Sequence, residues 1–479
     1  MSTERNIGLV WLRCDLRMKD NPALHTAVAE CDSVIVLYID APRDYWPMGG
    51  ASQWWLHHSL TALHAALGER GNQLTVQRGA PSDVLQAYID EYAIRAVYWN
   101  HVYEPKRLEA DDTLATALRE QGIQVKRGNG ALLNEPDSVR TKTDTVYRVF
   151  TPYWREAKKH IVDKPPVDAP TSIPAPQQTP ESLDIDALGL LPDIDWADGI
   201  AAAWTPGEAG AQASLATFLD GPVFDYDTAR DLPAVAGVSR LSPHLHFGEI
   251  SVRDAWHRVK TLDKHNDSTE TFLTELGWRE FSHYILCNFP QTADEPMYDK
   301  YANFPWRDNA DAMIEAWQRG HTGVPIVDAG MRQLWHTGWM HNRVRMTVAS
   351  FLVKNIRAHW LHGARWFWDT LVDADLPANS MGWQWSAGCG ADAAPYFRVF
   401  NPIRQGERFD KTGDYVRQWV PEVRDVPDKY VHAPWTLPEK FHAATGFTPG
   451  EHYPLPVVDL ATSRDEALAA FKSLKGDVS

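Results

Sequence analysis

The stretch "IGLVWLRCDLRMKDNPALHTAVAECDSVIVLYI", residues 7–39, decides the fold of the N-terminal part. Its two ends, 7–12 and 33–39, are short runs of aliphatic and β-branched residues, which are typical of buried strands. Between them, apolar residues recur at helical spacing over 21–30, and Asn21 stands where an N-cap belongs. A strand, a helix and a second strand form the unit of a parallel sheet, so we expect an α/β domain.

The same alternation continues to about residue 135. Strand-like runs at 74–78 and 96–100 are separated by helical patterns at 51–70, 81–92 and 108–121, and Ser82 occupies a second N-cap position. Neither GxGxxG nor GxxxxGK[ST] occurs in this domain. The fold of residues 1–135 therefore does not reveal a ligand.

Beyond the α/β domain the composition changes twice. Residues 136–208 become rich in proline from about 160 onward. Because proline removes backbone donors and disfavours regular structure, we expect this segment to be an interdomain linker. Residues 209–479 read as helical in nearly every window to about 395, with a partly irregular end from 400 onward. The fold class is thus α/β plus all-α, with a long linker between the domains.

Composition narrows the functional classes. The 479 residues carry a net charge of −16, which argues against binding nucleic acid through the whole surface but allows a local basic patch. Twenty-one tryptophans exceed ordinary usage, which suggests a role for indoles beyond packing. No apolar run is long enough to cross a membrane, and we expect a cytoplasmic protein. The cysteines show no metal-binding spacing and fit a reducing compartment: Cys14, Cys31, Cys287 and Cys389.

The segment "ADLPANSMGWQWSAGCGADAAPYFRVFNP", residues 374–402, combines Asn379, Trp383 and Trp385. A buried core segment is the simplest interpretation, because burying one tryptophan contributes on the order of 2 to 3 kcal/mol. A site that needs an amide beside two indoles is the functional alternative, and the segment alone does not decide between them.

A second candidate is "RDLPAVAGVSRLSPHLHFGEIS", residues 230–251, in which Ser239, Arg240 and Ser242 crowd around the start of a helix. Hydroxyls, backbone amides and a helix N-terminus can form a phosphate cradle. An ordinary capped helix start explains the same residues.

Two helical segments carry further polar groups. In "TELGWREF", residues 274–281, Glu275, Trp278 and Arg279 share one helical face, which suits an aromatic, polar guest with a nearby phosphate. An ordinary Glu–Arg pair on an amphipathic helix is the alternative.

In residues 338–355, polar side chains interrupt an apolar helix and need partners: His341, Asn342, Arg343 and Arg345. Asp373 and Asp375 are candidate partners for Arg345.

Together these segments resemble the DNA photolyase and cryptochrome family. The resemblance begins at "VWLRCDLRMKDNPAL", residues 10–24, includes "LGWREF" and "DAGMRQLWHTGWMHNRVRMTVASFLVK", and covers nearly the whole chain. The stretches "GGASQWWLHHSL" and "WTPGEAGA" are most similar to the bacterial class III branch, with class I next. The resemblance implies a Rossmann-like N-terminal domain and an all-helical C-terminal domain that binds FAD.

It also implies roles for individual residues. Asn379 would accept a hydrogen bond beside flavin N5, and Trp383, Trp360 and Trp306 would relay electrons from the flavin to the surface. The positions implied around FAD are Tyr226, Val238, Ser239, Arg240, Leu241, Ser242, Phe272, Asn342, Arg345, Asp373, Ala374, Asp375 and Asn379. Three departures from the family pattern are Val238 for threonine, Phe272 for tryptophan, and Ser380 with Met381 for Asn and Gly.

The activity implied is light-dependent repair of cyclobutane pyrimidine dimers in DNA by electron transfer from excited FADH⁻. A dimer pairs poorly and is therefore easier to flip into a pocket than a normal base. Glu275 would hydrogen-bond the pyrimidine, and Trp278 and Trp385 would form the pocket walls. The residues implied at the lesion and the strand are Arg230, Glu275, Trp278, Arg279, Asn342, Arg343, Met346, Trp385 and Gln405. We expect a monomer that contacts DNA and no membrane.

Alternatives remain within the family. A signalling cryptochrome would share the fold and FAD, but plant cryptochromes typically carry aspartate where Asn379 stands. A (6-4) photolyase characteristically uses a histidine pair where this chain has Asn342 and Met346. A second, light-harvesting chromophore is expected in or beside the N-terminal domain, with methenyltetrahydrofolate as first choice and 8-hydroxy-5-deazaflavin as second.

Overall fold

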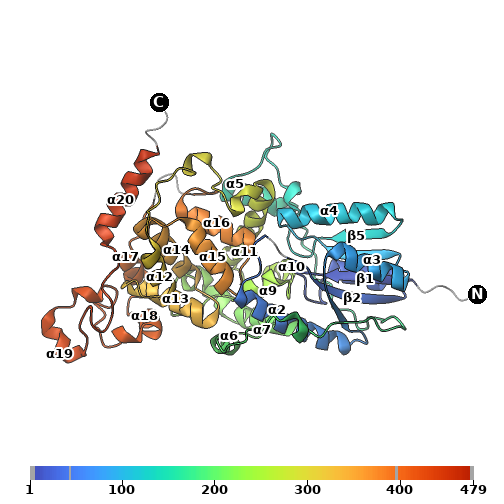
Figure 1. Cartoon of the computed structure of the whole chain (residues 1–479), viewed down its shortest axis with the longest axis horizontal. Helices are drawn as coiled ribbons and strands as arrows, with labels where there is room; N and C mark the ends of the chain where they lie inside the picture. Colours follow the sequence, from blue (N-terminus) through green and yellow to red (C-terminus); the bar gives the residue numbers. More distant parts are fainter. Residues whose placement is uncertain (1–5, 43–44, 394–397, 475–479) are drawn as a thin grey trace, which may run out of the picture.

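The computed structural model describes residues 6–42, 45–393 and 398–474. Figure 1 shows a sheet domain at one end of the long axis and a larger helical body at the other. The α/β plus all-α organisation expected from the sequence is confirmed.

The N-terminal domain is built on a parallel sheet of five strands in the order β3-β2-β1-β4-β5. The strands are β1 (Ile7–Leu12), β2 (Ser33–Asp40), β3 (Leu74–Arg78), β4 (Ala96–Asn100) and β5 (Gln124–Gly128). β1 and β2 pair in register from Ile7 with Ser33 to Leu12 with Tyr38. The edge strand β5 was not expected, because its sequence QVKRG lacks a buried apolar run.

Helices cover both faces of this sheet: α1 (Pro22–Glu30), α2 (Gly50–Gly68), α3 (Pro81–Tyr92) and α4 (Pro105–Glu120). Asn21 caps α1 as predicted, with its side chain accepting a hydrogen bond from the Leu24 amide at 3.2 Å. The prediction for Ser82 was wrong, because Ala80 is the N-cap and Pro81 the first helical residue of α3. Proline suits that first position because its missing N–H would have no helical partner there.

The expected linker, residues 136–208, is only partly a linker. It contains η1 (Pro136–Ser138), α5 (Phe150–His160), η2 (Asp186–Leu188) and α6 (Asp198–Ala203). α5 packs Phe150, Tyr153 and Trp154 into the core of the helical domain. The proline-rich part follows the sheet domain instead, where the Val34 amide donates to the Pro174 carbonyl at 2.8 Å.

The helical domain surrounds the long helix α11 (Asp267–Asn288). Its other α-helices are α7 (Glu208–Leu219), α8 (Tyr226–Ala229), α9 (Ser242–His246), α10 (Val252–Lys260), α12 (Asp311–Gln318), α13 (Pro325–Thr337), α14 (Asn342–Ser350), α15 (Trp360–Thr370), α16 (Leu376–Ala387), α17 (Pro402–Phe409), α18 (Asp414–Trp419), α19 (His442–Thr445) and α20 (Leu460–Ser473). A π-helical turn, η6 (Phe351–Ile356), continues α14, and 3-10 turns occur at η3 (Pro222–Asp225), η4 (Pro290–Ala293), η5 (Asp299–Tyr301), η7 (Pro421–Val423), η8 (Pro434–Thr436) and η9 (Glu439–Phe441).

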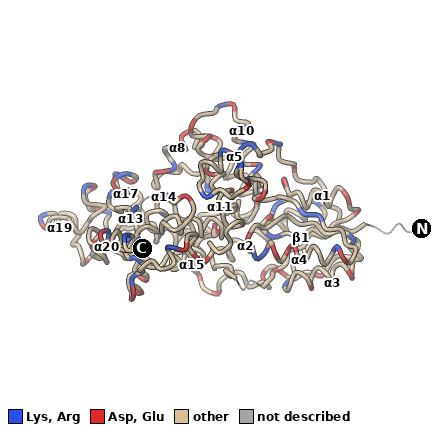
Figure 2. Tube along the Cα trace, turned by 90° about the horizontal axis from the view of Figure 1, so that it is seen from above, with Lys and Arg blue, Asp and Glu red and all other residues tan. Residues whose placement is uncertain are grey.

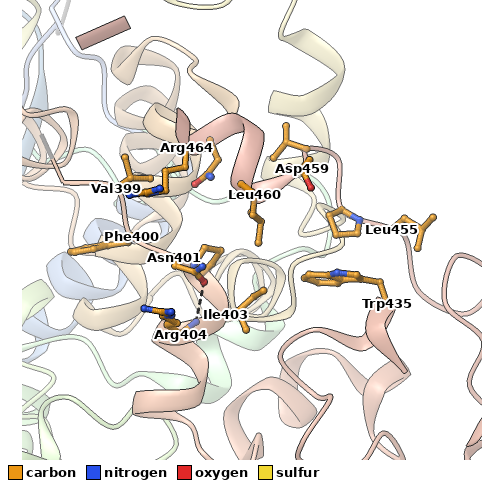
Figure 3. A pocket seen from close by; sticks show the side chains of 15 residues that line it. Val399, Phe400, Asn401, Ile403, Arg404, Trp435, Leu455, Asp459, Leu460 and Arg464 are labelled. Atoms are coloured by element: carbon orange, nitrogen blue, oxygen red, sulfur yellow. Dashed lines mark hydrogen bonds between the residues drawn. The ribbon is translucent and has the colours of Figure 1, made fainter. Parts of the chain in front are cut away.

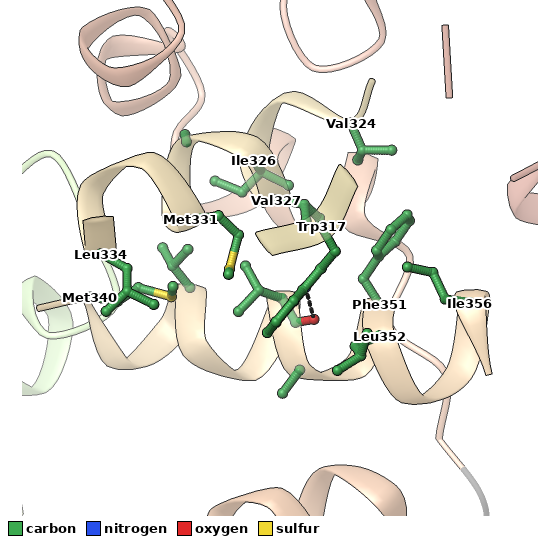
Figure 4. Close-up of a cluster of buried hydrophobic side chains, with 14 of the residues drawn as sticks. Trp317, Val324, Ile326, Val327, Met331, Leu334, Met340, Phe351, Leu352 and Ile356 are labelled. Atoms are coloured by element: carbon green, nitrogen blue, oxygen red, sulfur yellow. Dashed lines mark hydrogen bonds between the residues drawn. The ribbon is translucent and has the colours of Figure 1, made fainter. Parts of the chain in front are cut away.

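The largest hydrophobic cluster fixes α13 against α14 (Figure 4). Gly330 allows close approach, since a Cβ there would lie 2.5 Å from Val344. The buried Trp317 donates its indole N–H to the Val348 carbonyl at 3.0 Å and packs beside Phe351. This cluster holds α14 rigidly, and α14 carries several of the predicted site residues. No helix among the described residues has the length and apolarity to cross a membrane.

A buried carboxylate joins the two domains. Glu249 is fully buried and accepts hydrogen bonds from the Trp55 indole of α2 at 2.9 Å and from the Gly207 amide at 2.7 Å. Its other oxygen pairs with Nδ1 of His244 in α9. Three polar partners therefore depend on one side chain at the interface.

We predict that Glu249→Ala lowers the melting temperature by several degrees, since it leaves three buried polar groups without their partner at a cost of about 3 kcal/mol or more. Thermal unfolding followed by circular dichroism measures this. The control is Glu315→Ala in α12, whose exposed carboxylate pairs with Arg319, the residue that follows this helix. Equal shifts in the two variants would contradict the role of Glu249.

Candidate functional site

Asp375 ties three helices together at the start of α16. Its carboxylate caps α16 by accepting from the Ala378 amide at 3.1 Å. The other oxygen lies 3.3 Å from Nδ1 of His246 in α9 and 3.8 Å from Nε2 of His283 in α11. Burial would raise the pKa of Asp375, but the imidazoles of His283 and His246 outweigh it and lower the pKa below its usual range. Asp375 is therefore not the partner of Arg345 that the sequence offered as a candidate.

The partner of Arg345 is Asp373. Nη2 of Arg345 lies 2.8 and 3.0 Å from the two carboxylate oxygens of Asp373, which is buried. Nε of Arg345 donates to the Met340 carbonyl at 2.8 Å, so the guanidinium is held in a fixed orientation. Ala374, between the two acids, is buried. The pair links α14 to the segment that leads into α16.

Asn379 lies one turn into α16 with its side-chain orientation fixed. Its Nδ2 donates to the Ala364 carbonyl of α15 at 2.9 Å. Oδ1 accepts no hydrogen bond from the described residues and remains available as an acceptor. Gly382, three positions later on the same helical face, borders open space, since a Cβ there would meet no heavy atom within 4 Å. This face of α16 can therefore receive a guest that donates an N–H.

The three tryptophans predicted to form a relay lie in and against the same hydrophobic core. Trp383 packs on Gly363 of α15 and makes an edge contact with Phe367 at 5.0 Å. Trp360 begins α15, and the His359 ring lies between it and the partly buried Trp306, at 5.8 and 5.1 Å from their centroids. The order from the buried Trp383 to the half-buried Trp306 is compatible with the predicted relay.

A second polar group lies around the middle of α11. Nη1 of Arg230 lies 2.6 Å from Oε1 of Glu275, and Arg343 pairs with Asp231, its Nε at 3.1 Å. Burial raises the pKa of Glu275, and the charge of Arg230 only partly offsets it. Trp278 stacks on Phe150 of α5 with ring centroids 3.7 Å apart. The structure thus brings together a carboxyl, two guanidinium groups and an aromatic wall.

The predicted phosphate cradle is only partly formed, because its serines lie near the start of α9 whereas the Arg240 side chain contacts another residue. Ser239 Oγ accepts from the Leu241 amide at 3.4 Å, and Ser242 starts α9 at the surface. Arg240 adopts a left-handed backbone with φ 54°, and its guanidinium lies over the Trp204 ring at 3.9 Å. Its side chain is thus engaged elsewhere, and only its backbone is positioned to contribute.

Some of the remaining residues predicted from the sequence lie near these two polar groups, and others lie away from them. Tyr226 and Phe272 meet edge to face at 5.5 Å, with Val238 against the same core. Asn342 is exposed at the start of α14, and Met346 contacts Arg343 at 3.8 Å. Trp385 lies 6.3 Å from Phe400, and Gln405 lies on α17. Arg279 stands apart from the Glu275 group, because it donates to the backbone carbonyls of Ala131 and Leu245.

Sequence reasoning missed several partners: Asp231, His246, His283 and Phe150. His283 follows Arg279 by one helical turn, which is a readable signal of a shared face. Phe150 and His246 gave no such signal, because the residues they contact are 128 and 129 positions away.

His341 is a buried group with an unsatisfied atom. Its Nδ1 accepts from the Arg343 amide at 3.2 Å and caps α14, whereas Nε2 meets no hydrogen-bond partner among the residues that the structure describes. Burial lowers the pKa of His341 to about 4, with Arg343 and Arg345 acting in the same direction and Asp231 against it. The ring is therefore neutral at ordinary pH.

Comparisons with known proteins match both domains. The family model for DNA photolyase matches residues 8–176, and that for the FAD binding domain of DNA photolyase matches 272–473. The chain is 45% identical to a deoxyribodipyrimidine photo-lyase of Agrobacterium fabrum over 99% of both chains. It is 37% identical to Cryptochrome-1 of Arabidopsis thaliana, over 96% of this chain and 69% of that one. A bacterial class III photolyase structure from Agrobacterium tumefaciens superposes with a TM-score of 0.96 at 44% identity, covering 99% of each chain.

We predict that His341→Asn reduces the loss of stability in mild acid. Because burial puts the folded pKa of His341 below its unfolded value of 6.5, the unfolded state binds more protons as pH falls, and stability present above pH 6.5 is lost toward about pH 4. At about pH 5 this amounts to about 2 kcal/mol. Asparagine keeps the N-cap.

The measurement is the melting temperature at about pH 7.5 and about pH 5. The parent should lose more stability than His341→Asn, and His265→Asn, at an exposed position, should behave like the parent. An identical loss in all three proteins would contradict a neutral, buried His341.

Proposed function

The chain belongs to the DNA photolyase and cryptochrome family, and we propose on that premise that it repairs cyclobutane pyrimidine dimers in DNA, using light and FAD. The observation that carries the proposal is the Asn379 amide: Ala364 holds its nitrogen, and its oxygen is left as an acceptor on a helix face that borders open space. That arrangement suits a planar guest with an N–H at its edge, as reduced flavin has.

When bound, FAD supplies the light-driven electron that opens the cyclobutane ring and then returns to the cofactor. Asn379, whose nitrogen is held by Ala364, would accept a hydrogen bond at the ring edge, and the Arg345–Asp373 pair would border the ring with a fixed guanidinium. Ser239, Ser242 and the backbone amides around Arg240 hold the phosphates. Nε2 of His341, in a neutral ring near Arg343 and Arg345, offers a further polar contact.

Glu275 and the residues around it receive the flipped dimer. The raised pKa of Glu275 favours the protonated carboxyl, which can donate a hydrogen bond to a pyrimidine carbonyl. Trp278 and Trp385 enclose the dimer, with Asn342 and Met346 completing the pocket. Arg230 and Arg343 exchange their carboxylate partners for phosphates of the strand. Figure 2 shows acidic and basic residues intermingled along both domains, so contact with DNA depends on such local arginines.

Trp383, Trp360 and Trp306 would pass electrons from an external reductant at the surface to oxidised flavin. Repair itself would consume no electron, so the relay would be needed only to prepare the reduced cofactor. The indoles therefore matter for activation and not for turnover of an already reduced protein.

We infer that the light-harvesting chromophore binds in a cavity of about 390 Å³ between the domains. Trp11, Tyr38 and Trp46 give it flat apolar walls, and Ser52 and Leu56 of α2 contribute to its lining. Lys106 and Arg107 also line it, together with Glu104, which pairs with Arg107 at 3.2 Å. Lys106 would therefore be the cation that meets a carboxylate of methenyltetrahydrofolate. An absorption spectrum of the purified protein distinguishes folate from the deazaflavin alternative.

We predict that the reduced protein reverses dimers in an oligonucleotide under illumination and not in the dark, and that Glu275→Ala lowers the repair rate about tenfold, as expected for a lost hydrogen bond. Strand products are measured by chromatography. Glu270→Ala on the same helix is the control, because that exposed carboxylate pairs only with Lys260. Dimer reversal in darkness, or none in light, would refute the proposal.

We predict that Trp360→Phe abolishes photoreduction of oxidised flavin while chemically reduced protein still repairs dimers at nearly the parent rate. Trp366→Phe is the control, since Trp366 lies on the same helix but stacks outward on the exposed Trp335. If repair by pre-reduced Trp360→Phe falls as far as its photoreduction, Trp360 serves the fold or the pocket and not the relay.

A further inference from the structure

A cavity of about 950 Å³ lies where α17, α20 and the turn η8 meet (Figure 3). None of the residues predicted to contact flavin or the lesion lines it. Arg404 and Arg464 lie on one side, and the Trp435 ring lies on the other, with Ile403 and Leu460 between them. The cavity therefore has a cationic side and an aromatic side.

Two helices begin at this cavity. Asn401 caps α17 by accepting from the Arg404 amide at 3.1 Å, and Asp459 caps α20 by accepting from the Thr462 amide at 2.7 Å. Helix N-termini carry partial positive charge, which adds to that of Arg404 and Arg464. The Asp459 carboxylate also lines the cavity, but its capping bond already engages it.

A buried amide in the cavity wall is only half satisfied. Asn355 is 2% exposed, and its Nδ2 donates to Ser463 Oγ at 2.9 Å, which fixes the orientation of the amide. Oδ1 accepts no hydrogen bond within the described part of the chain. An unpaired buried carbonyl oxygen is costly, and a ligand N–H would satisfy it.

Guanidinium groups, helix N-termini, an aromatic face and an acceptor for N–H together match a nucleotide. The phosphate fits the arginine side, and the base stacks on Trp435. Oδ1 of Asn355 is buried in the wall, so a base N–H reaches it only if the side chain turns toward the cavity. A simple anion would leave Trp435 unused.

The position of the cavity indicates where the nucleotide comes from. Phe400 lines the cavity, and its ring lies 6.3 Å from Trp385, the predicted wall of the lesion pocket. At the far end of α17, Arg343 lies over the Phe409 ring at 4.5 Å. α17 thus runs from the cavity to the Glu275 group, a span of about 12 Å for eight helical residues.

We propose that this cavity binds a base and phosphate of the DNA strand a few nucleotides from the dimer, an inference that rests on the proposed function. The full-length protein with its cofactor is tested in the dark against two probes: a dimer-containing dinucleotide without flanks, and a dimer-containing single strand of roughly 12 nucleotides. Trp435→Leu and Arg464→Ala are compared with Trp335→Leu and Arg319→Ala, two exposed positions outside the cavity.

Each cavity variant should weaken binding of the longer strand about fivefold or more and leave binding of the dinucleotide unchanged. Arg464→Ala should also reduce the salt dependence of binding by about one phosphate contact. The control variants should bind both probes as the parent does.

Equal losses for both probes would place the effect in the lesion pocket and overturn the proposal, as would no loss for either. Binding of free dAMP that Trp435→Leu abolishes, with strand binding intact, would assign the cavity to a free nucleotide and overturn it too. If the unaltered protein does not prefer the dimer strand over an undamaged strand, the proposed function fails instead, and the assignment of the cavity to the neighbourhood of a dimer fails with it.

Discussion

The carboxylate of Asp375 is the constraint on which the candidate site depends. It caps α16 and also contacts His246 of α9 and His283 of α11, so one side chain sets where α16 begins relative to both helices. Asn379, Gly382 and Trp383 follow on α16 at fixed helical intervals. A change at Asp375 would therefore displace the amide and the first relay indole together.

Ion pairs around this helix differ in what they can do. Arg345 is held by the buried Asp373 and by a backbone carbonyl, so its direction is fixed. Arg230 and Arg343 pair with the partly buried Glu275 and Asp231, and neither guanidinium is held by a backbone carbonyl among the described residues. This difference fits the proposal that a rigid cofactor region lies next to a more responsive DNA-contacting region on an acidic protein.

Much of the fold could be predicted from local patterns, because strands β1 to β4 are apolar runs and Asn21 is a plain cap. The polar edge strand β5 and the helix α5 escaped because tertiary packing, not periodicity, stabilises them. Within the site, helical spacing predicted the shared face of Glu275 and Trp278. Helical spacing could not show whether Arg345 pairs with Asp373 or with Asp375. It also could not show that the Arg240 guanidinium lies over the Trp204 ring, since both contacts join segments that are distant in the sequence.

The orientation of Asn379 is the central claim, and the reoxidation of bound flavin in air tests it most directly. Protein reduced without oxygen is exposed to air while flavin absorbance is followed in the parent and in Asn379→Ala. If Oδ1 accepts a hydrogen bond from the reduced ring, the variant should retain FAD and reoxidise faster. Identical rates in the two proteins would mean that Asn379 does not face the flavin.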